Sequence, residues 1–233
     1  MQTARITQMT TTREAQRGVR RTTTAGEPSA RRLATRERLM DAAVELFGER
    51  GVLAASVEEI CERAGFTRGA FYSNFESKDE LCLGVLQRKG EQHLTAMQAA
   101  IDAIPDLQGR TMSTEELIRE AVRVFLEAQP KEVPEQVAMM ELRLHAVRTP
   151  ELRAGWLAVH EGISKSVSDL LAIALDRVGA RLAMPSDQVI ELLGAVYETT
   201  VSMSLLRGEE RPTGLAQQLA TLLDALIETD CTP

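Results

Sequence analysis

The feature that most constrains the fold is a run of helix start and stop signals, SVEEICERAGFTRGAFYSNFESKDEL, at residues 56–81. Ser56, followed three residues later by Glu59, is a capping box that predicts the start of a short helix. Gly65 predicts its end, because glycine adopts left-handed backbone without strain. Thr67 predicts the N-cap of a third helix of about seven residues. Two short helices joined by a tight turn are typical of a helix-turn-helix unit.

The rest of the chain predicts an all-α protein of about nine helices. Apolar residues at helical spacing predict a first helix at 34–50. A second capping box, Ser77 with Glu80, opens a long helix that is expected to reach residue 103. Five more helices are expected, and no segment alternates with the two-residue period of a strand. Their expected ranges are 114–129, 134–148, 150–179, 186–207 and 213–229.

Charge is distributed unevenly along the chain. The net charge is −7, yet residues 1–38 hold nine arginines and three glutamates, an excess of +6. Such an arm attracts polyanions, because Lys and Arg displace counterions from phosphates; a solvated leader without a ligand is the alternative. Low apolar content predicts that residues 1–32 form a flexible basic arm. A helix-turn-helix domain at 33–80 and a larger helical domain at 81–233 are expected to follow.

Composition argues against several classes of protein. No apolar run approaches the roughly 18 uncharged residues of a membrane span, and the N-terminus has no apolar secretory signal. A cytoplasmic protein without a membrane partner is therefore expected. Cys61, Cys82 and Cys231 do not predict a disulfide framework. Cys61 and Cys82 are expected to pack as small apolar residues, and redox sensing is the alternative. With three histidines and no catalytic motif, no metal site, no cofactor and no enzyme activity are expected.

The third expected helix has two different sides. At 100° per residue, Phe71 packs one side against the first helix. The opposite side carries Arg68, Gly69, Tyr72 and Ser73. Arginine bonds guanine edges or phosphate, and Tyr and Ser hydroxyls bond phosphate, so this side suits the edge of a DNA duplex. Lys78, at a helix N-terminus that disfavours a cation, lies beside free N–H groups that attract phosphate.

Residues 36–83, RERLMDAAVELFGERGVLAASVEEICERAGFTRGAFYSNFESKDELCL, resemble the DNA-binding domain of the TetR family of bacterial transcriptional regulators. The resemblance implies a nine-helix architecture, with an effector pocket enclosed by the fifth to seventh helices. It also implies that the last two helices pair with a second copy across a two-fold axis. The residues to which the resemblance assigns contacts with operator DNA are Ser56, Thr67, Arg68, Gly69, Tyr72, Ser73 and Lys78.

Apolar stripes in the last two expected helices predict a homodimer, because a terminal pair of helices has little else to pack against. The residues of these stripes are Val189, Leu193, Val196, Thr200, Met203, Leu215, Leu219, Leu222, Leu223, Leu226 and Ile227. A symmetric dimer would match a palindromic operator.

The effector pocket is expected to be aliphatic and rich in methionine, because few aromatic residues lie beyond the helix-turn-helix domain. The candidate lining residues are Met139, Met140, Glu141, Leu144, His145, Trp156, His160, Tyr197 and Glu198. For each of them, core packing is the alternative. The sequence therefore predicts a DNA-binding regulator, most simply a repressor released by a mainly apolar small molecule. A helical binding protein without operator contacts, or an enzyme, is the alternative.

Overall fold

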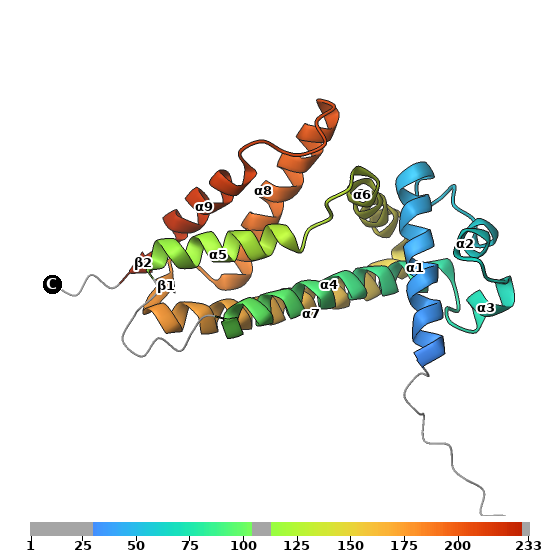
Figure 1. Ribbon diagram of the computed structural model, residues 1–233, viewed down its shortest axis with the longest axis horizontal. Coiled ribbons are helices and arrows are strands. Elements are labelled where there is room, and N and C mark those ends of the chain that lie inside the picture. Colours follow the sequence, from blue (N-terminus) through green and yellow to red (C-terminus); the bar gives the residue numbers. More distant parts are fainter. Residues whose placement is uncertain (1–29, 104–112, 230–233) are drawn as a thin grey trace, which may run out of the picture.

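The computed structural model describes residues 30–103 and 113–229. These residues form an elongated, almost entirely helical molecule with one small two-stranded sheet (Figure 1). The elements are α1 (Ala30–Arg50), α2 (Val57–Ala64), α3 (Arg68–Tyr72), α4 (Lys78–Ala103), α5 (Thr114–Glu127), α6 (Val133–Arg148), α7 (Pro150–Val178), β1 (Ala180–Leu182), α8 (Ser186–Leu206), α9 (Leu215–Leu226) and β2 (Ile227–Thr229). The predicted fold class is confirmed, and each predicted helix is present.

The helix-turn-helix unit begins and ends its helices at the residues that the sequence predicts. The Glu59 N–H donates to Ser56 Oγ at 3.2 Å, and the Ser56 N–H donates to Glu59 Oε2 at 2.9 Å. Gly65 ends α2 in left-handed conformation, with φ at 72°. Thr67 Oγ1 accepts from the Ala70 N–H at 3.3 Å. α3 has five residues, fewer than predicted, and so short a helix depends on packing for its stability.

One buried cluster, here called the shared core, joins the helix-turn-helix unit to the larger domain. Phe47 of α1, Ile60 of α2 and Phe71 of α3 are buried in it together with Leu142 of α6. α1 lies across the end of α4 and α7 (Figure 1), and α1 and α6 make the most extensive contact between any two elements described. The predicted domain boundary at residue 80 falls inside α4, and the two domains share a core.

The larger domain is built along α4 and α7, which lie side by side and form the long axis (Figure 1). β1 and β2 pair antiparallel, with Ala180 opposite Thr229 and Leu182 opposite Ile227. The sequence predicts no strands, and it predicts that the final helix runs to residue 229; both predictions are wrong. Strands of three residues have too few positions to show an alternating pattern, so the period that identifies a strand is absent.

Two predicted segments, the arm and the loop after residue 103, lie mostly or wholly outside the described residues. α1 begins at Ala30, inside the predicted arm; the rest of that arm and the loop after residue 103 lie outside the described residues.

In the described part of the chain, α8 is the helix that is long and apolar enough to cross a membrane by length and composition. It contains two carboxylates, Glu191 and Glu198. A helix that packs against neighbours within a folded domain has the same length and composition, so these two properties alone do not indicate a membrane span.

Candidate functional site

The exposed side of α3 carries four of the predicted DNA contacts. Phe71, on the opposite side, is fully buried in the shared core. Its ring meets the Tyr72 ring edge-on, with 5.3 Å between centroids, while 50% of Tyr72 is exposed. Arg68, Gly69 and Ser73 are exposed beside it. The predicted division of α3 into a packing side and an exposed side is confirmed, whereas its contact with DNA stays a prediction.

Arg68 is held only weakly by its neighbours. Its guanidinium pairs with Glu58 of α2 at 2.5 Å and lies 5.9 Å from the centroid of the Tyr72 ring. Both side chains of the ion pair are more than half exposed, so water screens the attraction. The guanidinium can therefore exchange this carboxylate for a phosphate or a guanine edge.

Ser56 and Lys78 are engaged with the protein itself. Ser56 Oγ donates to Glu59 Oε2 at 2.8 Å, within the capping box. Lys78 Nζ donates to the carbonyl oxygens of Val52 at 2.7 Å and Ala55 at 3.0 Å, which ties down the loop between α1 and α2. An ammonium group has three N–H donors, so one is left for a phosphate. The position of a lysine at this helix N-terminus thus has a structural reason that the sequence does not show.

A cavity of about 820 Å³ lies in the larger domain. Helices α4 to α9 all contribute to its wall, which thus includes the fifth to seventh helices that the resemblance implies and three more. A cavity of this size accommodates a small organic molecule. The predicted residues that line it are Met139, Met140, Leu144, Trp156, His160, Tyr197 and Glu198.

Two of the predicted pocket residues, Glu141 and His145, do not line the cavity. Glu141 Oε2 accepts from the N–H of Val52 at 3.3 Å, in the loop between α1 and α2. His145 Nε2 lies 2.8 Å from Asp79 Oδ1, in the first turn of α4. Both side chains extend from the side of α6 that faces the helix-turn-helix unit. α6 has apolar residues on opposite sides, so its sequence pattern does not distinguish the cavity side from the other.

His93 of α4 lines the cavity and is missed by the sequence analysis. Its ring lies 5.7 Å from the Phe125 ring, which meets Tyr197 edge-on at 5.6 Å. His93 Nε2 is buried and has no hydrogen-bond partner among the described residues. Burial lowers the pKa of His93, so the imidazole is neutral at pH 7. No motif marks this residue, because a lone histidine in a long helix is equally compatible with a solvated position.

Both cations at the cavity wall are paired with carboxylates. Lys89 pairs with Glu135, and Arg143 pairs with Glu198. Tyr197 keeps its phenolic proton, because burial raises its pKa to about 12. The charges of Lys89, Glu135, Arg143 and Glu198 are thus neutralised within the two ion pairs. The imidazole of His93 and the phenol of Tyr197 are neutral polar groups at this wall.

The apolar stripes predicted for the dimer interface are largely used within one chain. The fully buried members are Val189, Leu215, Leu219 and Leu223. They pack against Ile118 and Val122 of α5, a helix distant in sequence, so they are not available to a second copy. The half-buried members are Leu193, Val196, Thr200, Leu222, Leu226 and Ile227. Met203 is the exposed member of the predicted stripes.

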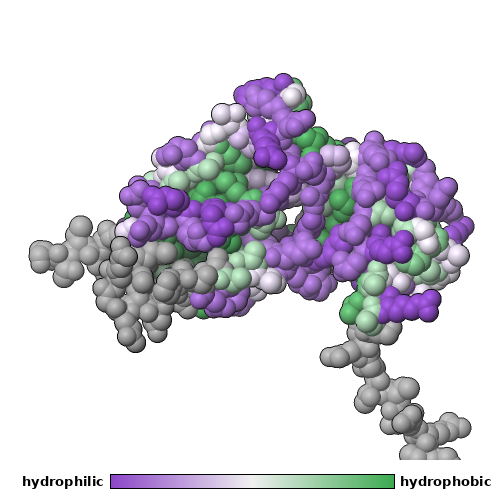
Figure 2. All heavy atoms as spheres, viewed as in Figure 1, coloured by the Kyte–Doolittle hydropathy of each residue, from purple (hydrophilic) through white to green (hydrophobic). Residues whose placement is uncertain are grey.

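α8 also carries apolar residues that one chain leaves exposed. Leu192 and Met203 are 40% and 42% exposed, and Leu206 is 80% exposed. Figure 2 shows apolar side chains reaching the surface around α8 and α9, while the end formed by α1 to α3 is mainly hydrophilic. Leu192 and Leu206 therefore extend the surface offered by Met203, the exposed member of the predicted stripes.

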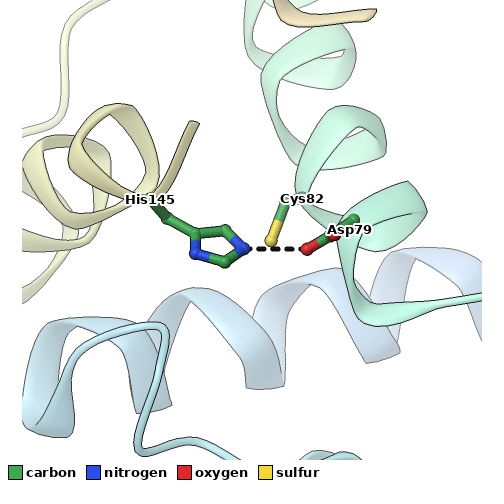
Figure 3. A group of neighbouring side chains, drawn as sticks. All are labelled: Asp79, Cys82 and His145. Atoms are coloured by element: carbon green, nitrogen blue, oxygen red, sulfur yellow. Dashed lines mark hydrogen bonds and ion pairs between the residues drawn. The ribbon is translucent and has the colours of Figure 1, made fainter. Parts of the chain in front are cut away.

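The described residues also contain one group of side chains that could hold a metal ion. Asp79, Cys82 and His145 come together between α4 and α6 (Figure 3). The buried positions predicted for Cys61 and Cys82 are confirmed, and Cys231 lies outside the described residues. The expectation of no metal site, which rests on the small number of histidines, takes no account of this arrangement.

Comparisons with known proteins agree with this architecture. Residues 39–85 match the family model for bacterial regulatory proteins of the tetR family. FasR, an HTH-type transcriptional activator of Mycolicibacterium smegmatis, is 36% identical over 92 residues, which cover 40% of this chain and 39% of FasR. UidR, an HTH-type transcriptional regulator of Escherichia coli, is 24% identical over 195 residues, which cover 82% of this chain and 94% of UidR.

A solved structure shows the same fold over most of the chain. The fatty acid degradation regulator FadR of Bacillus halodurans superposes with a TM-score of 0.66 at 18% identity, over 81% of this chain and 94% of FadR. The family match covers the capped helices and the exposed side of α3, and the fold agrees well beyond them. Residues 39–85 therefore belong to the TetR family of bacterial regulatory proteins, and the chain shares its fold with a solved regulator over most of its length.

Proposed function

We propose that this chain is a ligand-responsive transcriptional regulator, which binds a palindromic operator as a homodimer and is released by a mainly apolar small molecule. One observation carries the proposal: a single helix, α6, lies on the cavity with one side and on the helix-turn-helix unit with the other. FasR and UidR, both HTH-type regulators, support the DNA-binding part. Repression is proposed over activation because covering a promoter requires no contact with polymerase. Such a regulator acts in the cytoplasm and is not an enzyme.

Two helices are proposed to transmit ligand binding to the DNA-binding end. On α6, Met140 and Leu144 line the cavity, while Ala138 and Leu142 are buried in the shared core. α4 runs from the helix-turn-helix unit to the cavity wall, which it joins near His93. A ligand that binds one placement of these helices more tightly increases the population of that placement, and with it one orientation of α3. The difference in affinity between the two placements sets how far this equilibrium shifts.

A second copy of the chain is proposed to cover the exposed apolar side of α8. Leu192, Met203 and Leu206 would then meet the same side of the partner, as a two-fold contact requires. The dimer would present two α3 helices about 34–36 Å apart, one turn of DNA. Sedimentation of the full chain is expected to give twice the mass of one chain, and a monomer would contradict this part of the proposal.

Tyr72→Phe tests the proposed DNA contact, because it removes one hydroxyl from the exposed side of α3. Operator affinity is expected to fall about tenfold or more, since a hydrogen bond to a charged group contributes about 1.5–3 kcal/mol. Fluorescence anisotropy with the DNA that flanks the gene measures the affinity. Thermal unfolding should be unchanged, because half of Tyr72 is exposed.

Lys78→Met provides a contrast to Tyr72→Phe. This change removes two hydrogen bonds from the loop between α1 and α2, so it should lower the unfolding midpoint as well as operator affinity. If the Tyr72→Phe variant binds every upstream fragment as tightly as the wild type, Tyr72 is not a DNA contact. If the wild-type chain binds none of these fragments, the regulator proposal itself fails.

The effector is proposed to be an apolar molecule with a single hydrogen-bonding group near His93. The cavity wall is mainly aliphatic and aromatic, and the Lys89 and Arg143 cations are already paired. A buried nitrogen without a partner loses the hydrogen bond that it makes in water. A ligand hydroxyl or carbonyl near His93 Nε2 would restore it, whereas an anionic group would leave water without a free cation as its counterion.

His93→Leu tests this effector class with a matched pair of probes, a medium-chain 1-alkanol and the 1-chloroalkane of the same length. The wild type should bind the alkanol about fivefold more tightly than the chloroalkane, because one hydrogen bond contributes about 1 kcal/mol. Titration calorimetry should show that this preference disappears in His93→Leu, while affinity for the chloroalkane is kept. A preference of equal size in both proteins would exclude His93 as the polar contact.

A further inference from the structure

Three side chains with different donor atoms converge where α6 meets the start of α4 (Figure 3). Asp79 and Cys82 lie one turn apart on α4, and neighbours at this spacing share one side of a helix. His145 approaches them from α6. Its Nε2 lies 2.8 Å from Asp79 Oδ1, and the Cys82 sulfur is close enough that the three donor atoms all lie within 4.8 Å of one another.

The donor set matches that of a zinc site with an open position. Zn²⁺ takes sulfur, nitrogen and carboxylate oxygen ligands, and sites with three protein ligands keep a fourth position for water. In a tetrahedral site, bonds of about 2.0–2.3 Å place the ligand atoms about 3.3–3.8 Å apart, so the longest side of the cluster must contract by about 1 Å when the ion binds. Cys82 is fully buried, whereas Asp79 is 40% exposed and offers a route from solvent.

The surroundings of His145 also suit a metal ligand. A carboxylate accepts hydrogen bonds, so in the metal-free arrangement the Nε2–H donates to Asp79. Binding an ion through Nε2 requires the other tautomer, with the proton on Nδ1. Nδ1 lies 3.5 Å from Thr149 Oγ1, and a partner on the second ring nitrogen is what orients a metal-bound histidine. The chain thus supplies an acceptor at the position where the displaced proton would lie.

We propose that Asp79, Cys82 and His145 form a Zn²⁺ site, with water as the fourth ligand. On binding, the Cys82 thiol loses its proton to solvent and the His145 proton moves from Nε2 to Nδ1, so the ion replaces one proton and the hydrogen bond to Asp79. Without a cation, burial and then the charge of Asp79 raise the pKa of Cys82 to about 12, and a bound divalent ion reverses this. The sequence does not reveal the site, because Asp79 and His145 are 66 positions apart.

The site would join the two domains directly. Asp79 and Cys82 are in the first turns of α4, which follow the helix-turn-helix unit, and His145 is on the helix that borders the cavity with its opposite side. An ion held there would fix α6 against α4. This consequence rests on the proposed function, but the binding of the ion does not.

Cobalt titration of the full chain tests the site without reference to DNA. After treatment with a chelator, the wild-type chain should take up one Co²⁺ per chain, with the near-ultraviolet absorption of a thiolate–cobalt bond. Every protein in this experiment, including the one called wild type, carries Cys231→Ser, so that the C-terminal thiol does not contribute to the cobalt absorption. Cys61→Ser is the matched control, because Cys61 is a buried thiol of the same shared core outside the cluster, and it should bind cobalt as the wild type does.

Two variants decide the outcome. Cys82→Ser should lose the thiolate band, and Asp79→Asn, at the more exposed ligand, should lower cobalt affinity at least about tenfold while the fold is kept. Zn²⁺ should displace Co²⁺ and raise the unfolding midpoint of the wild type but not of Asp79→Asn. Absence of a thiolate band in the wild type, or its persistence in Cys82→Ser, would overturn the proposal and leave a hydrogen-bonded packing cluster. Operator binding is not measured, so this failure is separate from that of the regulator proposal.

Discussion

Replacing Phe71 by alanine is expected to lower the free energy of unfolding by about 3–5 kcal/mol. α3 has five residues, so its own backbone hydrogen bonds cannot hold it in place. Phe71 is 0% exposed in the shared core, and its ring lies 5.7 Å from that of Phe75. Because a typical domain has only about 5–15 kcal/mol of stability, much of it would be lost, and circular dichroism should show a clearly lower unfolding midpoint.

Tyr72→Ala is the matched comparison for Phe71→Ala, since it truncates a ring at the next position of the same helix. Half of Tyr72 is exposed, so its truncation should leave the unfolding midpoint close to that of the wild type. Both variants should lose operator affinity, Tyr72→Ala through a missing contact and Phe71→Ala through a displaced α3. If the two variants proved equally stable, Phe71 would not be the residue that anchors α3.

The local signals in the sequence predict the helix-turn-helix unit well because each of them acts on its own neighbours. Ser56 and Glu59 satisfy each other's backbone groups within one turn, and Gly65 ends α2 through its own backbone conformation. The same logic applies to Ser113, which forms a capping box with Glu116 at the start of α5. Such signals need no knowledge of the tertiary structure, so helix boundaries near them are predicted closely.

The sequence does not reveal which element each side of a helix contacts, and the predictions that differ from the structure are of this kind. α6 is apolar on opposite sides, so no pattern separates Met140, at the cavity, from His145, which faces α4. Leu219 belongs to a strong apolar stripe, but α5 covers it within the chain. The element that packs against the apolar side of a helix lies far away in sequence. Apolar spacing therefore predicts that this side of the helix is buried, but it does not identify the element that covers it.

Replacing Gly48 by alanine is expected to destabilise the protein by about 1–3 kcal/mol, the typical effect of overpacking. A Cβ atom on Gly48 of α1 would lie 2.2 Å from the carbonyl oxygen of Pro134 at the start of α6, and 2.8 Å from its carbonyl carbon. These are backbone atoms, which cannot rotate away as a side chain does, so α1 and α6 must separate. Since this contact orients the DNA-binding end, operator affinity should fall together with the unfolding midpoint.

Gly162→Ala is the matched control, because Gly162 is also inside a helix but a Cβ there would meet nothing within 4 Å. Helix propensity alone makes alanine about 0.5–1 kcal/mol more stable than glycine, so this variant should gain stability. The two substitutions are chemically identical, and the expected opposite signs isolate the close approach of α1 and α6. A Gly48→Ala protein as stable as Gly162→Ala would show that the two helices do not pack this closely, and α6 could then not carry a signal from the cavity to the DNA-binding end.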